Sequence, residues 1–187
     1  MSAIQTFRAV PGVLIAVPQL GDPNFRRSVV VMLEHDDQGA LGLVINQPLP
    51  HACADVAQSF GLTWGGAPES RLRRGGPVEP QSLWILHEDR LQFDETSPVA
   101  PGIAVSRSRE ALTGLCEGGE RPVRLVVGYA GWGPGQLEGE MASGSWIQAP
   151  VSPALVFEWA PEAIWDRALA GLGIDPVHLA GATDVLQ

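Results

Sequence analysis

The segment over residues 125–140, LVVGYAGWGPGQLEGE, most constrains what this chain can fold into. A β-branched run at Val123–Val127 leads into it and is typical of a buried strand. The four glycines that follow remove side chains where the chain must turn sharply. Pro134 suits the first turn of a helix, because its missing N–H costs little there. We therefore predict a strand, a glycine turn, a short helix over Gln136–Met141, and a further strand starting at Trp146-Ile147.

The glycine segment has two interpretations that the sequence leaves open. In the first, the glycines let Tyr129 and Trp132 pack closely against neighbouring backbone, which is a structural role. In the second, Tyr129, Trp132 and Gln136 form a surface that meets a partner, since exposed aromatic residues favour such roles. A phosphate cradle is disfavoured, because Pro134 has no N–H and Glu138 brings a carboxylate to the positive end of the helix.

The length of 187 residues, with 45% apolar and 18% charged side chains, is that of one folded domain. We predict a single domain over residues 1–187, with residues 1–10 and 180–187 as loose termini. The N-terminus lacks a charged region followed by an apolar core, and no apolar run approaches the roughly 18 residues that cross a bilayer. These features predict a cytoplasmic protein with no membrane contact.

The charge pattern limits the partners and the chemistry of the chain. Its formal net charge is −9, which opposes a general attraction to nucleic acid. All 12 basic residues are arginine, so Schiff-base chemistry and a lysine general base are excluded. Three of them, Arg71, Arg73 and Arg74, concentrate positive charge in the turn-rich segment Ser70–Pro80. This segment is either a solvated loop or a binding site for a phosphate or carboxylate group.

A metal site is the most specific catalytic hypothesis that the sequence offers. His35 and His87 each follow a predicted strand and each is followed by two acidic residues. If the strand ends converge, imidazoles and carboxylates would hold a divalent metal that activates water. Histidine and aspartate are also ordinary turn residues, and no spacing fixes these ligands on one face. We therefore expect no cofactor, and we keep a metal-assisted hydrolase as the alternative function.

Nucleophilic catalysis has little support in the sequence. Ser145 is not part of a GxSxG elbow, and no His and Asp pair is assigned to it. Cys116 falls on the apolar face of a predicted helix and is expected to be inert. Cys53 lies two residues from His51, a spacing at which helical side chains point in different directions. The chain therefore lacks a complete catalytic constellation.

The order of elements predicts the fold class. Ser28–Leu33 and Ala40–Asn46 form a predicted hairpin, and Arg109–Glu117 a helix capped by Ser108. An amphipathic helix is predicted to begin at Pro161. Because strands and helices alternate irregularly, we expect an α+β domain with a mixed sheet.

The assembled motifs resemble the AlgH/YqgE family, a bacterial domain family of uncharacterised function. The resemblance covers most of the chain through the blocks GVLIAVPQLGDPNFRRSVVVMLEHDDQGALGLVINQPL, GGPVEPQSLWILHEDR, LVVGYAGWGPGQLEGEM and WDRALAGLGIDP. It implies a strongly bent mixed sheet, flanked by helices, that partly closes into a small barrel. It brings no established reaction and no assigned catalytic residue. Family members are often labelled putative transcriptional regulators, although the motifs include no recognisable DNA-reading helix.

The sequence thus predicts a binding or regulatory protein without chemistry of its own, whose partner is a protein or a small molecule. The candidate binding residues are Tyr129, Trp132, Gln136, Glu138, Arg71, Arg73, Arg74 and Asn46. The alternative is the metal-assisted hydrolase, built on His35 and His87 with neighbouring carboxylates.

Overall fold

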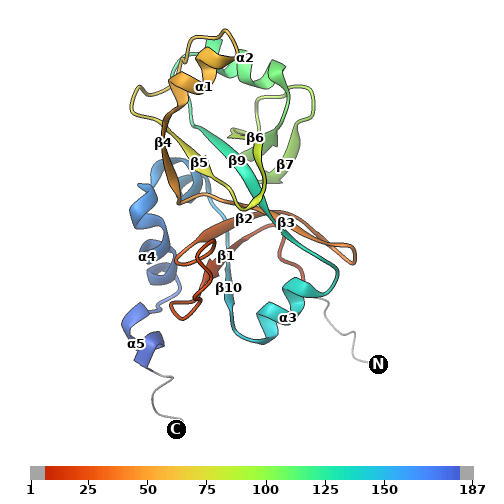
Figure 1. Cartoon of the computed structure of the whole chain (residues 1–187), viewed down its shortest axis with the longest axis vertical. Coiled ribbons are helices and arrows are strands. Elements are labelled where there is room, and N and C mark those ends of the chain that lie inside the picture. The colour runs from red at the N-terminus through yellow and green to blue at the C-terminus, as the bar shows by residue number, and fades with distance from the viewer. Residues whose placement is uncertain (1–6, 182–187) are drawn as a thin grey trace.

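A computed structural model describes residues 7–181, which form a long open sheet with helices on both of its sides (Figure 1). Its strands are β1 Val13–Ala16, β2 Val29–Asp36, β3 Gly39–Val44, β4 Pro48–Ala52, β5 Arg71–Arg74, β6 Val78–His87, β7 Ser97–Ala100, β8 Ile103–Ser106, β9 Val123–Trp132 and β10 Trp146–Ala149. Its helices are α1 Cys53–Ser59, α2 Arg109–Glu117, α3 Gln136–Ala142, the π-helix η1 Ala154–Glu158, α4 Pro161–Gly171 and α5 Pro176–Gly181.

The strands follow the order β10-β1-β2-β3-β9-β6-β8-β7, with β5 beside β9 and β4 beside β5. Among the described strand pairs, β5 with β9 is parallel and the others are antiparallel. The predicted α+β class with a mixed sheet is therefore confirmed.

The small barrel implied by the family resemblance is wrong, because the sheet does not close. Strands β10 and β7 stand at opposite ends of the order, and neither pairs with the other. One edge of β9 is divided between β5, which pairs with Val126 and Val127, and β3, which pairs with residues 130–132. The sheet therefore forks along β9 instead of curling round to meet itself.

Strand β9 continues past the predicted β-branched run Val123–Val127, through Gly128 to Trp132, and the turn begins at Gly133. Gly128 has a φ of 72°, and a Cβ there would lie 2.6 Å from the Gly76 carbonyl oxygen. Only glycine permits this crossing of β9 and the start of β6. By contrast, a Cβ at Gly131 or Gly133 would make only ordinary van der Waals contacts. The close backbone approach at Trp132 is made by Gly39, where a Cβ would lie 2.2 Å from the Trp132 carbonyl oxygen.

Both faces of the sheet are covered, which explains the continuous apolar run of β1. Val13 and Ile15 belong to a core that η1 and α4 cover. The alternate residues Leu14 and Ala16 pack in a second core that includes Leu137 of α3. A third core joins α1 and α2 to the first half of β9. In Figure 1, α1 and α2 lie above the crossing strands, and α3 and α4 lie below.

Several predicted elements are confirmed and one is corrected. Helix α3 starts at Gln136 as expected, and the Ser108 side chain accepts a hydrogen bond from the Ala111 N–H (3.1 Å) at the start of α2. The predicted loop Ser70–Pro80 is wrong: it contains β5 and the start of β6, because Arg73 and Arg74 pair with β9.

The predicted loose termini fall mainly outside the described residues, which exclude 1–6 and 182–187. In the described parts of these two predicted termini, Ala9 is fully buried, and residues 180 and 181 belong to α5. None of the helices in the described part of the chain has the length and apolar character needed to cross a membrane.

Candidate functional site

His35 lies at the end of β2, and both of its ring nitrogens are engaged. Nδ1 accepts a hydrogen bond from the Ala9 N–H (2.9 Å), and Nε2 faces the Glu138 Oε1 (2.8 Å). Because a backbone N–H can only donate, Nδ1 carries the lone pair and Nε2 carries the proton. Glu138, one of the predicted binding residues, is therefore the acceptor of this bond. The pKa of the Glu138 carboxyl is lowered, mainly by the hydrogen bond from its own backbone N–H and secondly by the hydrogen bond from His35.

His87 is buried at the end of β6 with a different set of partners. Its Nδ1 donates to the Glu88 carbonyl (2.9 Å), and its Nε2 accepts from the Ser106 hydroxyl (2.7 Å). Ser106 in turn bonds to the Thr96 hydroxyl (2.6 Å), and the ring of Phe93 packs edge-on against the imidazole. Burial lowers the pKa of His87. The serine and histidine have the arrangement of a nucleophile and base, which the sequence did not reveal, but both are 0% exposed and closed to substrate.

The structure does not favour a metal site. The two histidines share no hydrogen-bond partner, and each is satisfied within its own part of the fold. Across residues 7–181, no group of three or more His, Cys, Asp or Glu side chains is placed to hold a metal ion. The hypothesis of a metal-assisted hydrolase on His35 and His87 therefore has no geometric support.

Trp132 is a core residue with 6% of its surface exposed. Its indole N–H donates to Glu140 Oε2 (2.9 Å), and the Trp146 indole donates to the same oxygen (2.8 Å). Gln136 donates to the other oxygen of Glu140 (3.0 Å) and accepts the Gly133 N–H (3.1 Å). We call Trp132, Trp146 and Glu140 the tryptophan cluster. In it, both indole N–H groups have a charged acceptor.

The remaining predicted residues are dispersed. Tyr129 is half-buried, packs edge-on against Trp84 (ring centroids 5.8 Å apart), and lines a shallow depression of about 460 Å³ with Trp132. Asn46 links two segments, since it accepts the Val29 N–H (2.9 Å) and donates to the Arg27 carbonyl (2.8 Å). The structure thus separates the predicted surface into several places, and a partner site at Tyr129 stays a prediction.

The three arginines of β5 divide between the two faces of the sheet. The parallel register sets Arg73 opposite Val126 of β9, which brings Arg71 opposite Arg124. Directly opposed residues share a face, so Arg71, Arg73 and Arg124 gather on one side. Arg74 points to the other side, where it donates to the Asn24 side chain (2.7 Å). We call Arg71, Arg73 and Arg124 the arginine trio.

The arginine trio lines one hollow of about 330 Å³, which we call the arginine hollow. The residues around it come from the start of β4, α1, the loop before β5, the first half of β9, η1 and α4: Pro48, Cys53, Ala67, Glu69, Ser70, Arg71, Arg73, Val123, Arg124, Leu125, Phe157 and Pro161. The three arginines face a single lining carboxylate, that of Glu69. The hollow is therefore positive within a protein that is acidic overall.

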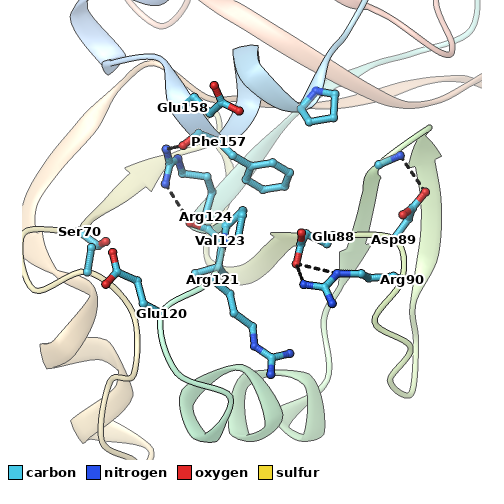
Figure 2. Close-up of a pocket in the computed structure, with 14 residues that line it drawn as sticks. Ser70, Glu88, Asp89, Arg90, Glu120, Arg121, Val123, Arg124, Phe157 and Glu158 are labelled. Carbon is cyan, nitrogen blue, oxygen red and sulfur yellow. Dashed lines mark hydrogen bonds and ion pairs between the residues drawn. The ribbon is translucent and has the colours of Figure 1, made fainter.

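Of the two inner arginines, Arg73 is buried and Arg124 is half-buried, and neither guanidinium is paired with a carboxylate at ion-pair distance among the described residues. Arg73 is 6% exposed and donates to the Ile45 carbonyl. Arg124 donates to the carbonyls of Val123 (3.0 Å), Val156 (3.1 Å) and Phe157 (Figure 2). Burial, reinforced by the charge of Arg124, lowers the pKa of Arg73 to about 10, and burial also lowers the pKa of Arg124.

The π-helix η1 fixes the outer wall of the hollow. Its wider turn is closed by the hydrogen bond from the Trp159 N–H to the Ala154 carbonyl (3.0 Å). The wider turn leaves the carbonyls of Val156 and Phe157 directed at Arg124. Single π-turns are rare and occur frequently at functional sites.

Cys53 lies in the wall of the arginine hollow, but its thiol is not a nucleophile. Burial raises the pKa of Cys53 to about 11, although the arginines Arg124 and Arg73 act in the opposite direction. The thiolate is therefore scarce at neutral pH. This agrees with the expectation of unreactive cysteines.

A second hollow of about 490 Å³ adjoins the first and is drawn in Figure 2. The two share the lining residues Ala67, Ser70, Val123, Arg124 and Phe157. Sequence reasoning singled out Arg71 and Arg73 but missed Arg124, Phe157 and this second hollow. The available signal was a charged residue inside an otherwise apolar strand, RLVV.

Comparison with known proteins places the chain in a family. The family model described as AlgH-like matches residues 13–177. A "UPF0301 protein" from Myxococcus xanthus is 45% identical over 171 residues, which cover 90% of this chain and 93% of that protein. A "UPF0301 protein" from Xanthomonas oryzae pv. oryzae is 36% identical over 169 residues, covering 89% and 90%.

Two solved structures share the fold. The solution structure of the AlgH protein from Pseudomonas aeruginosa has a TM-score of 0.74 and 32% identity, and covers 96% of this chain and 97% of that one. A crystal structure of a protein from Corynebacterium diphtheriae has a TM-score of 0.72 and 24% identity, covering 91% and 90%. The second likeness concerns the fold alone.

Proposed function

This chain belongs to the AlgH-like family, and we propose that it is a cytoplasmic binding protein that holds a small anion, a phosphate or carboxylate group, in the arginine hollow. One observation carries the proposal. Arg73, which is buried, and Arg124, which is half-buried, both lie in the wall of one hollow, and their hydrogen-bond partners are backbone carbonyls instead of carboxylates.

Electrostatics supports an anion at this place. A buried charge is costly unless a counter-charge and hydrogen bonds compensate it. Carbonyl groups supply only partial negative charge, and two like charges lie close together. An anion in the hollow would neutralise Arg73 and Arg124 and would accept their unused N–H donors. Guanidinium groups match the oxygens of phosphate and carboxylate with paired hydrogen bonds.

The lining supports binding without chemistry. The described residues around the arginine hollow include no histidine, and the pKa of Cys53 is raised away from the reactive range. A bound anion would instead tie β5 and β9 to η1, which precedes α4. Such a contact between segments far apart in the chain gives a regulatory role a physical basis, because the ligand would stabilise the conformation that it binds.

The proposal is tested by calorimetric titration of the whole protein with sodium phosphate and with sodium succinate at constant ionic strength. We expect saturable binding of at least one of them. Arg73→Gln and Arg71→Gln should each weaken it by roughly 10- to 100-fold, the value of one charge-assisted hydrogen bond or more. Arg71 is exposed, so its substitution leaves the core intact.

Arg26→Gln is the matched control. Arg26 is exposed, lies away from the hollow and makes no side-chain hydrogen bond with the described residues, so its loss changes the net charge equally. Binding that falls as much in Arg26→Gln as in Arg71→Gln would reflect general electrostatics. That outcome, or the absence of saturable binding, would contradict the proposed function.

A further inference from the structure

The second hollow extends the arginine hollow but has a different chemical character. Arg124 and Ser70 line both hollows, so a ligand that contacts Arg124 in one can continue into the other. The second hollow has the size of a small-molecule pocket, at about 490 Å³. Its charged lining residues are the carboxylates Glu88, Asp89, Glu120 and Glu158 and the arginines Arg90, Arg121 and Arg124.

Two of these carboxylates already have partners within the protein. Glu88 pairs with Arg90 (2.7 Å), and Asp89 accepts the Gly102 N–H (2.8 Å), as the dashed lines of Figure 2 mark. Glu120 and Glu158 have no hydrogen-bond or ion-pair partner among residues 7–181. Their oxygens are acceptors, so they fit hydroxyl or ammonium groups and repel a second anion.

The ring of Phe157 lines both hollows. Figure 2 shows it projecting into the hollow next to Arg124, with Glu158 beside it. Phe157 is 9% exposed, and its backbone carbonyl accepts a hydrogen bond from the Arg124 guanidinium, which fixes its position. An apolar ring wall of this kind packs against the carbon skeleton of a ligand, while the polar groups at each end fix its orientation.

From this arrangement, and resting on the proposed anion site, we infer that the ligand has two unlike ends. An anionic head lies on the arginine trio, and a tail with hydroxyl or ammonium groups reaches Glu120 and Glu158 in the second hollow. Phosphate monoesters of polyols and of amino alcohols have this chemistry. Diphosphates and nucleic acid backbones do not, because their second negative charge would face free carboxylates.

The test compares ligands with the same head. Dissociation constants of inorganic phosphate, pyrophosphate, glucose 6-phosphate and phosphoethanolamine are measured on the whole protein at constant ionic strength. At least one of the two monoesters should bind about tenfold or more tightly than inorganic phosphate, the gain of roughly one charge-assisted hydrogen bond. Glucose 6-phosphate tests hydroxyl recognition and phosphoethanolamine tests ammonium recognition. Pyrophosphate should show no such gain.

The double substitution Glu120→Gln with Glu158→Gln isolates the tail. It should reduce the advantage of the monoester over phosphate, while the binding of phosphate itself stays the same or tightens, because nearby negative charge is removed. Glu34→Gln, on β2 and outside both hollows, is the control and should change neither value.

The outcomes separate the two proposals. If phosphate binds but neither monoester gains affinity, or if the gain survives in the double variant, the two-ended ligand is wrong and the anion site stands. If neither phosphate nor the monoesters bind the unmodified protein, this inference falls together with the anion site.

Discussion

The tryptophan cluster and the arginine trio are two groups of polar side chains to which β9 contributes, through Trp132 and Arg124, and they differ in the partners that their polar groups have. In the tryptophan cluster, two indole N–H groups converge on one carboxylate of Glu140. In the arginine trio, the guanidinium groups of Arg73 and Arg124 meet only backbone carbonyls.

This difference separates a structural group from a binding group. A buried polar network with all its partners present stabilises the fold and gains nothing from a ligand. A buried charge without a counter-ion costs folding free energy and gains from one. The sequence places its most distinctive motif at the tryptophan cluster, but the unmatched charge lies elsewhere, between β5 and η1.

The largest expected effect on stability is at Glu140, the shared acceptor of the tryptophan cluster. Glu140→Ala leaves the indoles of Trp132 and Trp146 without an acceptor, and should lower the free energy of unfolding by about 2–4 kcal/mol. Urea unfolding followed by tryptophan fluorescence measures this. The exposed Glu34 makes no side-chain hydrogen bond in the described part of the chain, so Glu34→Ala should stay within about 0.5 kcal/mol. A loss below about 1 kcal/mol for Glu140→Ala would mean that the cluster does not support the fold.

His87 is a second buried polar side chain whose hydrogen-bond partners are all present, and its role can be tested through the pH dependence of stability. Burial lowers its pKa below the ordinary value of 6.5, so the unfolded chain takes up a proton before the folded protein does. The contribution of His87 to the free energy of unfolding should therefore be complete above pH 6.5, and it should be lost as the pH falls toward the pKa of His87 in the folded protein. Urea unfolding between about pH 7.5 and pH 5.5 follows this loss.

The variant His87→Gln removes the titrating group and should flatten the pH dependence in that range. Glu138, whose pKa is lowered from 4.5, contributes only at more acidic pH and does not interfere. A pH profile that is equally steep with and without His87 would assign the dependence to other groups.

Arg73 should give the smallest change in stability. Arg73→Gln loses the hydrogen bond to the Ile45 carbonyl, but it also removes a buried charge and its repulsion with Arg124. These effects oppose each other, so the free energy of unfolding should change by less than about 1 kcal/mol. Urea unfolding at neutral pH checks it. A loss as large as that of Glu140→Ala would make Arg73 a structural residue like those of the tryptophan cluster.

Local signals in the sequence predicted much of the fold. The helix at Gln136 and the Ser108 cap follow from the nearby proline, serine and apolar spacing, and the structure confirms them. Strand β5 was missed because its sequence, RLRR, carries one apolar side chain and resembles a loop. It is a strand because β9, some fifty residues away, supplies its partner, and local preference cannot reveal such a pairing.

The candidate site was predicted in part for the same reason. Arg71 and Arg73 are conspicuous as a local concentration of charge, but their neighbour Arg124 becomes visible only through the register of β5 on β9. The π-turn of η1, which aims two carbonyls at Arg124, follows no pattern in the sequence. Conversely, the indoles of the glycine segment suggested a surface, and Trp132 is instead enclosed by Glu140 and Phe25.

A phosphate titration followed by amide chemical shifts, with the ¹⁵N-labelled whole protein, tests the difference between the two regions most directly. We expect saturable shifts confined to β5, the first residues of β9 and η1, with the segment around Trp132 unchanged. Shifts centred on the glycine segment, or a uniform drift over the whole surface, would contradict this expectation.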